Sequence, residues 1–278
     1  MPLNCMCSSD SNSFNTVLCQ SRISLILIAL LFSLANSKAT AQGSGLFHRT
    51  YSSKGKLDSP TLVLVLHGDS PFGNPSYQYA IARTIANENQ NVVAVGILRP
   101  GYIDDEGNRS EGERGNTTGD NYTPEVMKAI QKLTSTLKEK HQPSKVLLVG
   151  HSGGAAISAN LISTDGASYQ GAVLVSCPCD LKEWRKHMKG QQPNTNIWDM
   201  KVDSLSPIEE LKGIDDKTPI TIIHGDQDPV APFSQVQNYV EKLKESGKNV
   251  AFIRLENLAH EVAFNPQVFK AVSRFIQP

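Results

Sequence analysis

The residues whose types and spacing most clearly suggest catalysis lie around Ser152. The pentapeptide Gly150-His151-Ser152-Gly153-Gly154 stands between an aliphatic run, residues 145–149, and a segment, 155–162, whose apolar residues suit a helix packed against a sheet. In that context Gly-x-Ser-x-Gly is typical of a nucleophile elbow, a turn so tight that the residues two before and two after the serine must be nearly free of side chains. Gly150 and Gly154 meet that requirement. We expect the serine oxygen to project from the top of the sheet, beside the positive end of the following helix.

An acid and a base follow the serine in the chain. Asp228 comes shortly after the apolar run 219–223, and His260 comes shortly after the apolar run 249–255. Serine is a weak nucleophile that needs a base to take its proton, and an aspartate can fix the histidine's tautomer and stabilise its cationic form. Because each residue follows a predicted strand, all three are expected at one edge of a parallel sheet. The sequence therefore predicts a catalytic Ser152, Asp228 and His260.

Backbone donors for a developing negative charge are expected after an earlier strand. The apolar run 61–66 ends in His67-Gly68-Asp69-Ser70. A His-Gly pair at the end of an early buried strand is a common place for one oxyanion-hole N–H. We predict the N–H of Asp69 as that donor, with Ser70 as the second choice.

The elements that must position these residues alternate between strands and helices, which predicts a single α/β domain. Thr123 and Pro124 have the types of a helix cap and first helical residue. The predicted strands are 46–52, 61–66, 91–98, 145–149, 171–176, 219–223 and 249–255, and the predicted helices are 77–87, one opening at 124, the elbow helix, and 266–276.

Taken together, these motifs resemble the α/β-hydrolase family across essentially the whole region after the leader. The matching parts are His67-Gly68, the pentapeptide 150–154, His224-Gly225-Asp226-Gln227-Asp228 before Val230 and Pro232, and the late His260. Their order, Ser-Asp-His, is the family's order. The resemblance implies an eight-stranded, mostly parallel sheet flanked by helices.

The resemblance also assigns residues within the site. It implies the backbone N–H of Gly153 as the second oxyanion donor, and its His-Gly-x-x-Asp pattern selects Asp228 over Asp226. The glycine-adjacent histidines are expected to support the site rather than act as bases; they are His67, His151 and His224.

Two segments are candidates for shaping the substrate pocket. A short lid is predicted at about 180–206, where Trp184 and Trp198 either line an acyl or aromatic pocket or anchor the segment on the core. The acidic loop 101–122 borders the site or is a solvated excursion. The brief lid and the lack of a Gly-Gly-Gly loop argue against an interfacially activated triglyceride lipase.

The amino-terminal residues read as a leader. Residues 23–35 are mostly apolar and precede Ala39-Thr40-Ala41, so 1–41 is predicted to be a signal peptide and 42–278 a single secreted or periplasmic domain. About thirteen apolar residues are too few for a stable membrane anchor. Of the five cysteines, Cys177 and Cys179 lie in the mature chain, either as a disulfide or as two free thiols.

The net charge and the motifs together limit the functions that we expect. Lys plus Arg equals Asp plus Glu at 27 each, which gives no electrostatic reason to expect nucleic acid. We expect a hydrolase of small-molecule esters that needs no cofactor or metal. A serine peptidase or amidase and a non-catalytic binding member of the fold are the alternatives, with an acyltransferase behind them. The sequence does not determine the oligomeric state.

Overall fold

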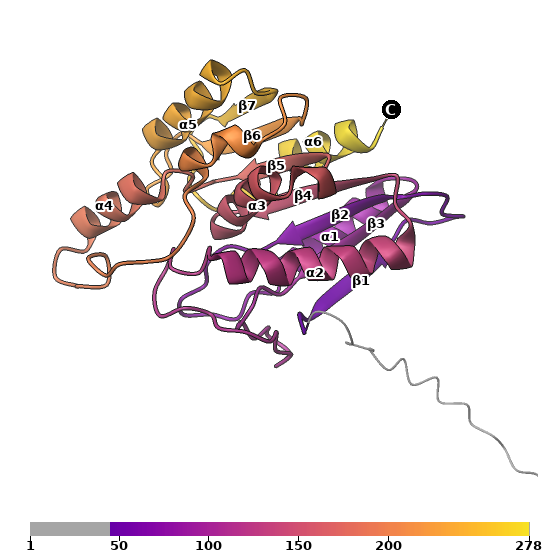
Figure 1. Ribbon diagram of the computed structural model, residues 1–278, viewed down its shortest axis with the longest axis horizontal. Helices are drawn as coiled ribbons and strands as arrows, with labels where there is room; N and C mark the ends of the chain where they lie inside the picture. Colours follow the sequence, from indigo (N-terminus) through magenta and orange to yellow (C-terminus); the bar gives the residue numbers. More distant parts are fainter. Residues whose placement is uncertain (1–44, 278) are drawn as a thin grey trace, which may run out of the picture. The chain divides into compact units, whose positions relative to one another are not determined.

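The computed structural model describes residues 45–277, and a seven-stranded sheet forms their centre (Figure 1). The strands lie in the order β1-β3-β2-β4-β5-β6-β7. All neighbouring pairs are parallel except β1 and β3, which pair antiparallel at one edge. The bounds are β1 His48–Ser52, β2 Thr61–Leu66, β3 Val92–Ile97, β4 Lys145–His151, β5 Gly171–Val175, β6 Ile220–Gly225 and β7 Val250–Leu255.

The central strands are apolar throughout because helices cover both faces of the sheet. Along β2, Leu62, Leu64 and Leu66 enter one buried cluster, whereas Val63 and Val65 enter the other. Residues from α2, α3 and α5 complete the first cluster, and residues from α1 and α6 complete the second. The helices are α1 Tyr77–Glu88, α2 Pro124–His141, α3 Gly153–Thr164, α4 Leu181–Gln191, α5 Phe233–Glu245 and α6 Pro266–Ile276.

Local sequence explains how several of these helices begin. Thr123 caps α2, its side chain accepts from the N–H of Val126, and Pro124 fills the first helical position, as predicted. Asn265 caps α6 in the same way, by accepting from the N–H of Gln267. These caps fix where each helix leaves the sheet edge.

The elements differ from the prediction in three places. The described residues form seven strands rather than eight, and the antiparallel edge contains β1 alone. No helix was predicted within the lid segment 180–206, but α4 occupies 181–191 and only the segment after it is irregular, apart from two short 3₁₀ turns. The helix α5, between β6 and β7, was not predicted at all.

The two cysteines form a disulfide at the end of β5. Cys177 and Cys179 are bonded and buried, with their Cα atoms 5.2 Å apart. Ser176, just before them, has a φ of 50°, so the chain turns sharply there. The Cα separation of 5.2 Å lies within the range that a disulfide allows, so the structure decides the alternative that the sequence left open in favour of the bond.

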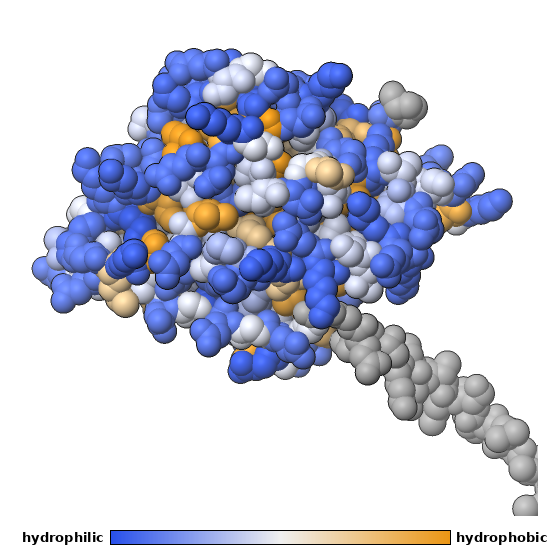
Figure 2. Space-filling view, in the orientation of Figure 1, coloured by the Kyte–Doolittle hydropathy of each residue, from blue (hydrophilic) through white to orange (hydrophobic). Residues whose placement is uncertain are grey.

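Figure 2 shows a face on which hydrophilic residues predominate and apolar patches are small and separate. Within residues 45–277, no helix combines the length and the apolar character needed to cross a bilayer. The predicted signal peptide, 1–41, lies outside the described residues.

Candidate active site

Ser152 occupies the sharp turn between β4 and α3. Its φ of 53° and ψ of −121° are rarely adopted by residues with a side chain, which is the backbone strain of an elbow. A Cβ at Gly150 would collide with the backbone of Gly154, and a Cβ at Gly154 would collide with the carbonyls of Leu66 and His67. The turn is therefore possible only with glycine at these two positions.

The structure brings Ser152, His260 and Asp228 into one hydrogen-bonded chain. The Ser152 Oγ lies 2.9 Å from His260 Nε2, and His260 Nδ1 lies 2.7 Å from Asp228 Oδ2. The other carboxylate oxygen of Asp228 accepts from the N–H groups of Val230 and Ala231 at 2.8 and 2.9 Å. Burial opposes ionisation of Asp228, but the hydrogen bond and charge of His260 outweigh it and lower its pKa.

Asp226, the competing acid, faces away from this chain. Its carboxylate binds Arg254 at 2.7 Å and accepts from the N–H of Asn257 at 2.7 Å. The hydrogen bond from Arg254 is the largest influence on Asp226 and lowers its pKa. The side chain has no contact with His260, so Asp228 alone of the two can orient the base.

The two predicted oxyanion donors lie side by side next to the serine. A Cβ at Gly68 would come within 2.9 Å of the Ser152 Cβ, and a Cβ at Gly153 would come within 2.6 Å of Asp69 Oδ1. Gly153 begins α3, where backbone N–H groups have no intrahelical acceptor. Within the described residues, the N–H of Asp69 has no protein acceptor either. Two free backbone donors therefore flank the serine.

His151 supports the base from behind. The Tyr77 hydroxyl accepts from the N–H of Gly68 at 2.6 Å and donates to His151 Nδ1 at 2.8 Å. His151 Nε2 then donates to the carbonyl of His260 at 3.3 Å, and Ser176 Oγ donates to the same carbonyl at 2.8 Å. Burial, with the charge of His260 second, lowers the pKa of His151 to about 4, so the ring stays neutral and keeps this tautomer.

The other glycine-adjacent histidines hold loops. His67 Nδ1 donates to the carbonyl of Gly68 at 2.7 Å, and its Nε2 accepts from the N–H of Arg99 at 3.0 Å. His224 Nε2 donates to the carbonyl of Ala231 at 2.8 Å, on the loop that carries Asp228. Burial lowers the pKa of both rings. Neither is placed to act as a base on Ser152.

A cavity of about 610 Å³ opens over Ser152 and His260. Both tryptophans predicted as pocket residues line it, and both are buried, packed edge to face with ring centroids 5.6 Å apart. Trp184 also donates from Nε1 to the carbonyl of Val230 at 2.8 Å. The two proposed roles thus coexist, because the rings line the cavity and anchor the segment. Other lining residues are Phe72, Thr117, Thr118, Met188, Ile197 and Glu261.

Arg185 connects two of the segments that surround the cavity. Its guanidinium donates to the carbonyls of Ile197 and Met200, beyond α4, and to the carbonyl of Thr118 in the loop before α2. The loop 101–122, for which a solvated excursion was one interpretation, is therefore part of the cavity wall.

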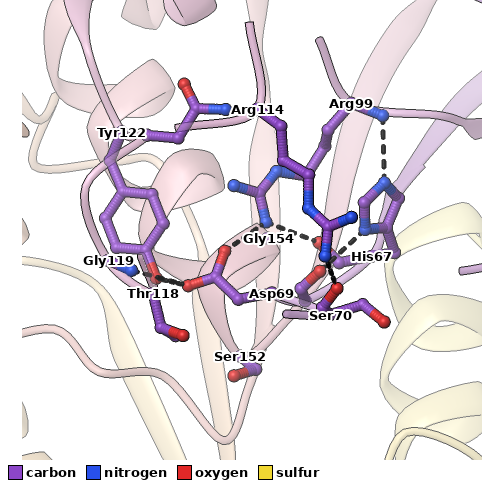
Figure 3. Close-up of polar contacts among 12 residues, drawn as sticks. His67, Asp69, Ser70, Arg99, Arg114, Thr118, Gly119, Tyr122, Ser152 and Gly154 are labelled. Carbon is purple, nitrogen blue, oxygen red and sulfur yellow. Dashed lines mark hydrogen bonds and ion pairs between the residues drawn. The ribbon is translucent and has the colours of Figure 1, made fainter. Parts of the chain in front are cut away.

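Sequence reasoning missed a group of charged and polar residues beneath the predicted oxyanion loop. Figure 3 shows the Asp69 carboxylate between the ring of Tyr122 and the guanidinium of Arg99, with Ser152 close by. Arg99 comes two residues after the end of the apolar strand β3, and Tyr122 ends the acidic loop. A charged residue at the end of a fully apolar strand was the available signal.

One group of side chains in the described part of the chain could share a metal ion: His151, His260 and Glu261, whose ligand atoms lie within 4.8 Å of one another. The ring nitrogens of both histidines are already engaged in the hydrogen bonds given above. That no metal or cofactor is needed stays a prediction.

Comparison with solved structures identifies the class of fold. Est1E from Butyrivibrio proteoclasticus, solved with ferulic acid bound, superposes with a TM-score of 0.60 at 15% identity, covering 83% of this chain and 93% of its own. A monoacylglycerol lipase from Paleococcus ferrophilus gives 0.56 at 17% identity, covering 83% and 98%. An acylaminoacyl peptidase from Pyrococcus horikoshii gives 0.61 at 16% identity, covering 84% of this chain but 38% of its own. The protein has the α/β-hydrolase fold, as predicted.

A sequence comparison assigns the chain to one family within this fold. Residues 108–277 match the profile of peptidase S9, the prolyl oligopeptidase family, and this chain belongs to that family of serine hydrolases. No curated protein sequence matches the chain.

Proposed function

We propose that this protein cleaves carboxylic esters of small substrates through an acyl-enzyme on Ser152. The observation that carries the proposal is the hydrogen-bonded chain from Ser152 through His260 to Asp228, which opens into a cavity of about 610 Å³. The nucleophile, base and orienting acid are already within hydrogen-bond distance, so substrate needs only to bring its carbonyl carbon to the serine oxygen.

In the first half of the reaction, Ser152 becomes acylated. His260 Nε2 takes the Oγ proton as Oγ bonds to the ester carbonyl carbon, and the carbonyl electrons move to oxygen, where the N–H groups of Asp69 and Gly153 stabilise them. The oxyanion then collapses, the carbon–oxygen bond to the alcohol breaks, and the alcohol leaves with the proton from His260.

In the second half, water replaces the alcohol. His260 removes a proton from the water as its oxygen bonds to the acyl carbon, and the second oxyanion is held by the same two N–H groups. When this intermediate collapses, the bond to Ser152 breaks and His260 returns the proton to Oγ. Asp228 keeps Nδ1–H of His260 in place throughout and stabilises the imidazolium formed in each half.

The lining of the cavity supports an ester with an uncharged acyl group. Within the described residues, no lysine or arginine lines the cavity; Trp184, Met188, Ile197 and Trp198 form its apolar part, and Asn116, Thr117, Thr118, Gln192 and Glu261 line the rest. An apolar acyl group suits such a wall better than an anionic one. The monoacylglycerol lipase, whose substrates are esters, is matched over 98% of its own length.

A serine peptidase or amidase is the second candidate. The name of the prolyl oligopeptidase family favours it, as does the structural likeness to an acylaminoacyl peptidase. The match covers 38% of that peptidase, so most of its chain has no counterpart here. The same serine chemistry applies, with an amine in place of the alcohol as the group that leaves.

The test combines active-site labelling with two substrate series. The protein is treated with a fluorophosphonate probe, and the modified residue is located by mass spectrometry. Hydrolysis of p-nitrophenyl esters of increasing acyl length is measured beside hydrolysis of peptide anilides. Ser152→Ala serves as the control for both.

We expect label on Ser152 alone and ester turnover that depends on acyl length and disappears in Ser152→Ala. Faster turnover of anilides than of esters would replace the esterase proposal with the peptidase. A folded protein that takes no label and hydrolyses nothing would favour the non-catalytic binding member of the fold.

A further inference from the structure

The residue predicted to give one oxyanion N–H carries a buried carboxylate that the catalytic steps do not use. The side chain of Asp69 is 7% exposed and lies 2.8 Å from the guanidinium of Arg99, which is fully buried. Breaking a buried ion pair by removing one partner is strongly unfavourable, because it leaves an uncompensated charge inside the protein. The surroundings of Asp69 show what this pair supports.

Both carboxylate oxygens of Asp69 are taken by donors from different segments. Arg99, which follows β3, donates to Oδ1, whereas the Tyr122 hydroxyl at 2.7 Å and the N–H of Gly119 at 2.9 Å donate to Oδ2 (Figure 3). Because its oxygens already have these three donors, the carboxylate is a poor candidate for a substrate ligand. Instead it joins the loop after β2 to the ends of two other segments.

The peptide group that carries the Asp69 N–H is held from its other side as well. The carbonyl of Gly68 belongs to the same planar peptide group and accepts from His67 Nδ1 at 2.7 Å. His67 in turn accepts from the N–H of Arg99 at 3.0 Å. Arg99 therefore fixes this peptide group twice, once through the side chain of Asp69 and once through His67.

Position gives the pair an electrostatic role too. A Cβ on Gly153 would lie 2.6 Å from Asp69 Oδ1, so the carboxylate is adjacent to the residue proposed as the second oxyanion donor. A negative charge so close would oppose the negative charge that develops on the substrate oxygen. The Arg99 guanidinium supplies the balancing positive charge from within the protein.

We propose that Asp69 and Arg99 form a positioning pair for the oxyanion hole, in which Asp69 fixes the donor peptide and Arg99 neutralises the carboxylate beside it. This inference rests on the proposed function, because it concerns how the same site stabilises its transition state. Arg99 acts through Asp69 and does not touch the substrate.

The test compares four variants on the best p-nitrophenyl ester: Arg99→Met, Arg99→Met with Asp69→Asn, Tyr122→Phe, and Arg254→Met. The last is the matched control, because Arg254 also pairs with an aspartate in a His-Gly-Asp sequence, but its side chain is 56% exposed and does not line the cavity. Each variant is checked for folding by circular dichroism, and kcat and KM are measured separately.

In Arg99→Met the unbalanced carboxylate remains beside the oxyanion. We expect kcat to fall about 100-fold, the scale of one lost oxyanion donor, with KM within about threefold of the wild type. Removing the second charge in the double variant should recover about tenfold in kcat. Tyr122→Phe removes one hydroxyl and should lower kcat by about three- to tenfold. Arg254→Met should stay within about twofold.

A merely structural role gives a different pattern. It predicts that the double variant is as poor as Arg99→Met or poorer, because more native contacts are lost, and either result would overturn the proposal. Should Arg99→Met fail to fold, the double variant and Tyr122→Phe test the proposal instead. Wild-type kcat in Tyr122→Phe would contradict a positioning pair. So would a double variant with normal kcat and raised KM.

The two proposals fail separately. Hydrolysis that persists in Ser152→Ala would remove the proposed function and this inference with it. Hydrolysis that depends on Ser152 but is unchanged in a folded Arg99→Met variant would leave the proposed function intact and reject the positioning pair alone.

Discussion

At the scale of single residues, the site separates two acids that stand two positions apart. Asp228 contacts His260 and two backbone N–H groups, whereas Asp226 pairs with the half-exposed Arg254. The hydrogen bond between an aspartate and Nδ1 of a catalytic histidine affects the reaction rate far more than it affects folding stability. It sets the tautomer that accepts the serine proton.

We therefore expect Asp228→Asn to lower kcat by about 10⁴-fold with little change in KM. Asp226→Asn is the matched control and should lower kcat by less than about tenfold, since it weakens a surface ion pair. The measurement is kcat for a p-nitrophenyl ester with both purified variants. A larger loss in Asp226→Asn than in Asp228→Asn would mean that the acid was assigned wrongly.

How much of the site the sequence predicts depends on whether a residue's role is local. Ser152 was found because its two flanking glycines and its strand-to-helix context are contiguous in the chain. Arg99 and Tyr122 were missed because their roles depend on β2 lying beside β3, and no local pattern contains strand order. For the same reason the tie between His151 and Tyr77 could not be predicted beyond a general supporting role.

At the scale of elements, a glycine in the elbow and a glycine in α4 differ in whether the structure has room for a side chain. Gly154 lies where α3 passes directly over the end of β2, and a Cβ there would collide with backbone carbonyls that cannot move aside. Gly190 lies exposed near the end of α4, and a Cβ there would meet nothing within 4 Å.

Gly154→Ala is therefore expected to destabilise the protein by more than about 2 kcal/mol and to abolish activity, since the elbow must open to admit the methyl group. Gly190→Ala should raise the free energy of unfolding by about 0.5–1 kcal/mol, because alanine loses less backbone entropy in a helix. Urea unfolding curves measure both. Equal effects of the two substitutions would contradict the close packing of α3 on β2.

Because α4 lies beside the cavity, we expect it to limit the size of the acyl group that the cavity accepts. Met188→Trp should fill the cavity and lower kcat/KM for an octanoate ester by about tenfold or more, while an acetate ester stays within about threefold. Met200→Trp is the control, because Met200 is exposed and lies outside this cavity. An unchanged ratio of octanoate to acetate in Met188→Trp would exclude this wall from the acyl site.

Helices and strands were predicted correctly where burial requires an almost uniformly apolar sequence. The strands β2 and β4 to β6 are nearly continuous apolar runs, and the predicted bounds of β2 and α6 agree with the structure. By contrast, α4 buries only Leu181, Trp184 and Arg185 among many polar residues, so its sequence lacks a clear apolar face. An eighth strand was expected by resemblance, and nothing in the sequence itself indicated it.

At the scale of the whole molecule, buried neutral histidines link folding to pH. Burial holds the pKa of His151 at about 4 and lowers the pKa values of His67 and His224. In the unfolded chain these rings titrate near the ordinary value of about 6.5. Below that pH the unfolded state binds protons that the folded state does not, so stability decreases as pH falls.

We expect the free energy of unfolding to decrease from pH 7 to pH 4.5, with His151 alone accounting for up to about 3 kcal/mol by pH 4. Urea unfolding at half-unit intervals of pH measures the slope. In His151→Gln, which has no proton to gain, the slope should be shallower. A stability that is flat or rises as pH falls would contradict the neutral, buried state of these rings.

The order of the strands also has a consequence during synthesis. Ser152 directly follows β4, at the centre of the sheet, but Asp228 follows β6 and His260 follows β7, the last strand among the described residues. A ribosome delivers the chain from its amino end, so a nascent chain can present Ser152 well before it can present His260. We therefore expect activity only in chains made past β7, because a product shortened within β7 would retain the serine without the histidine that activates it.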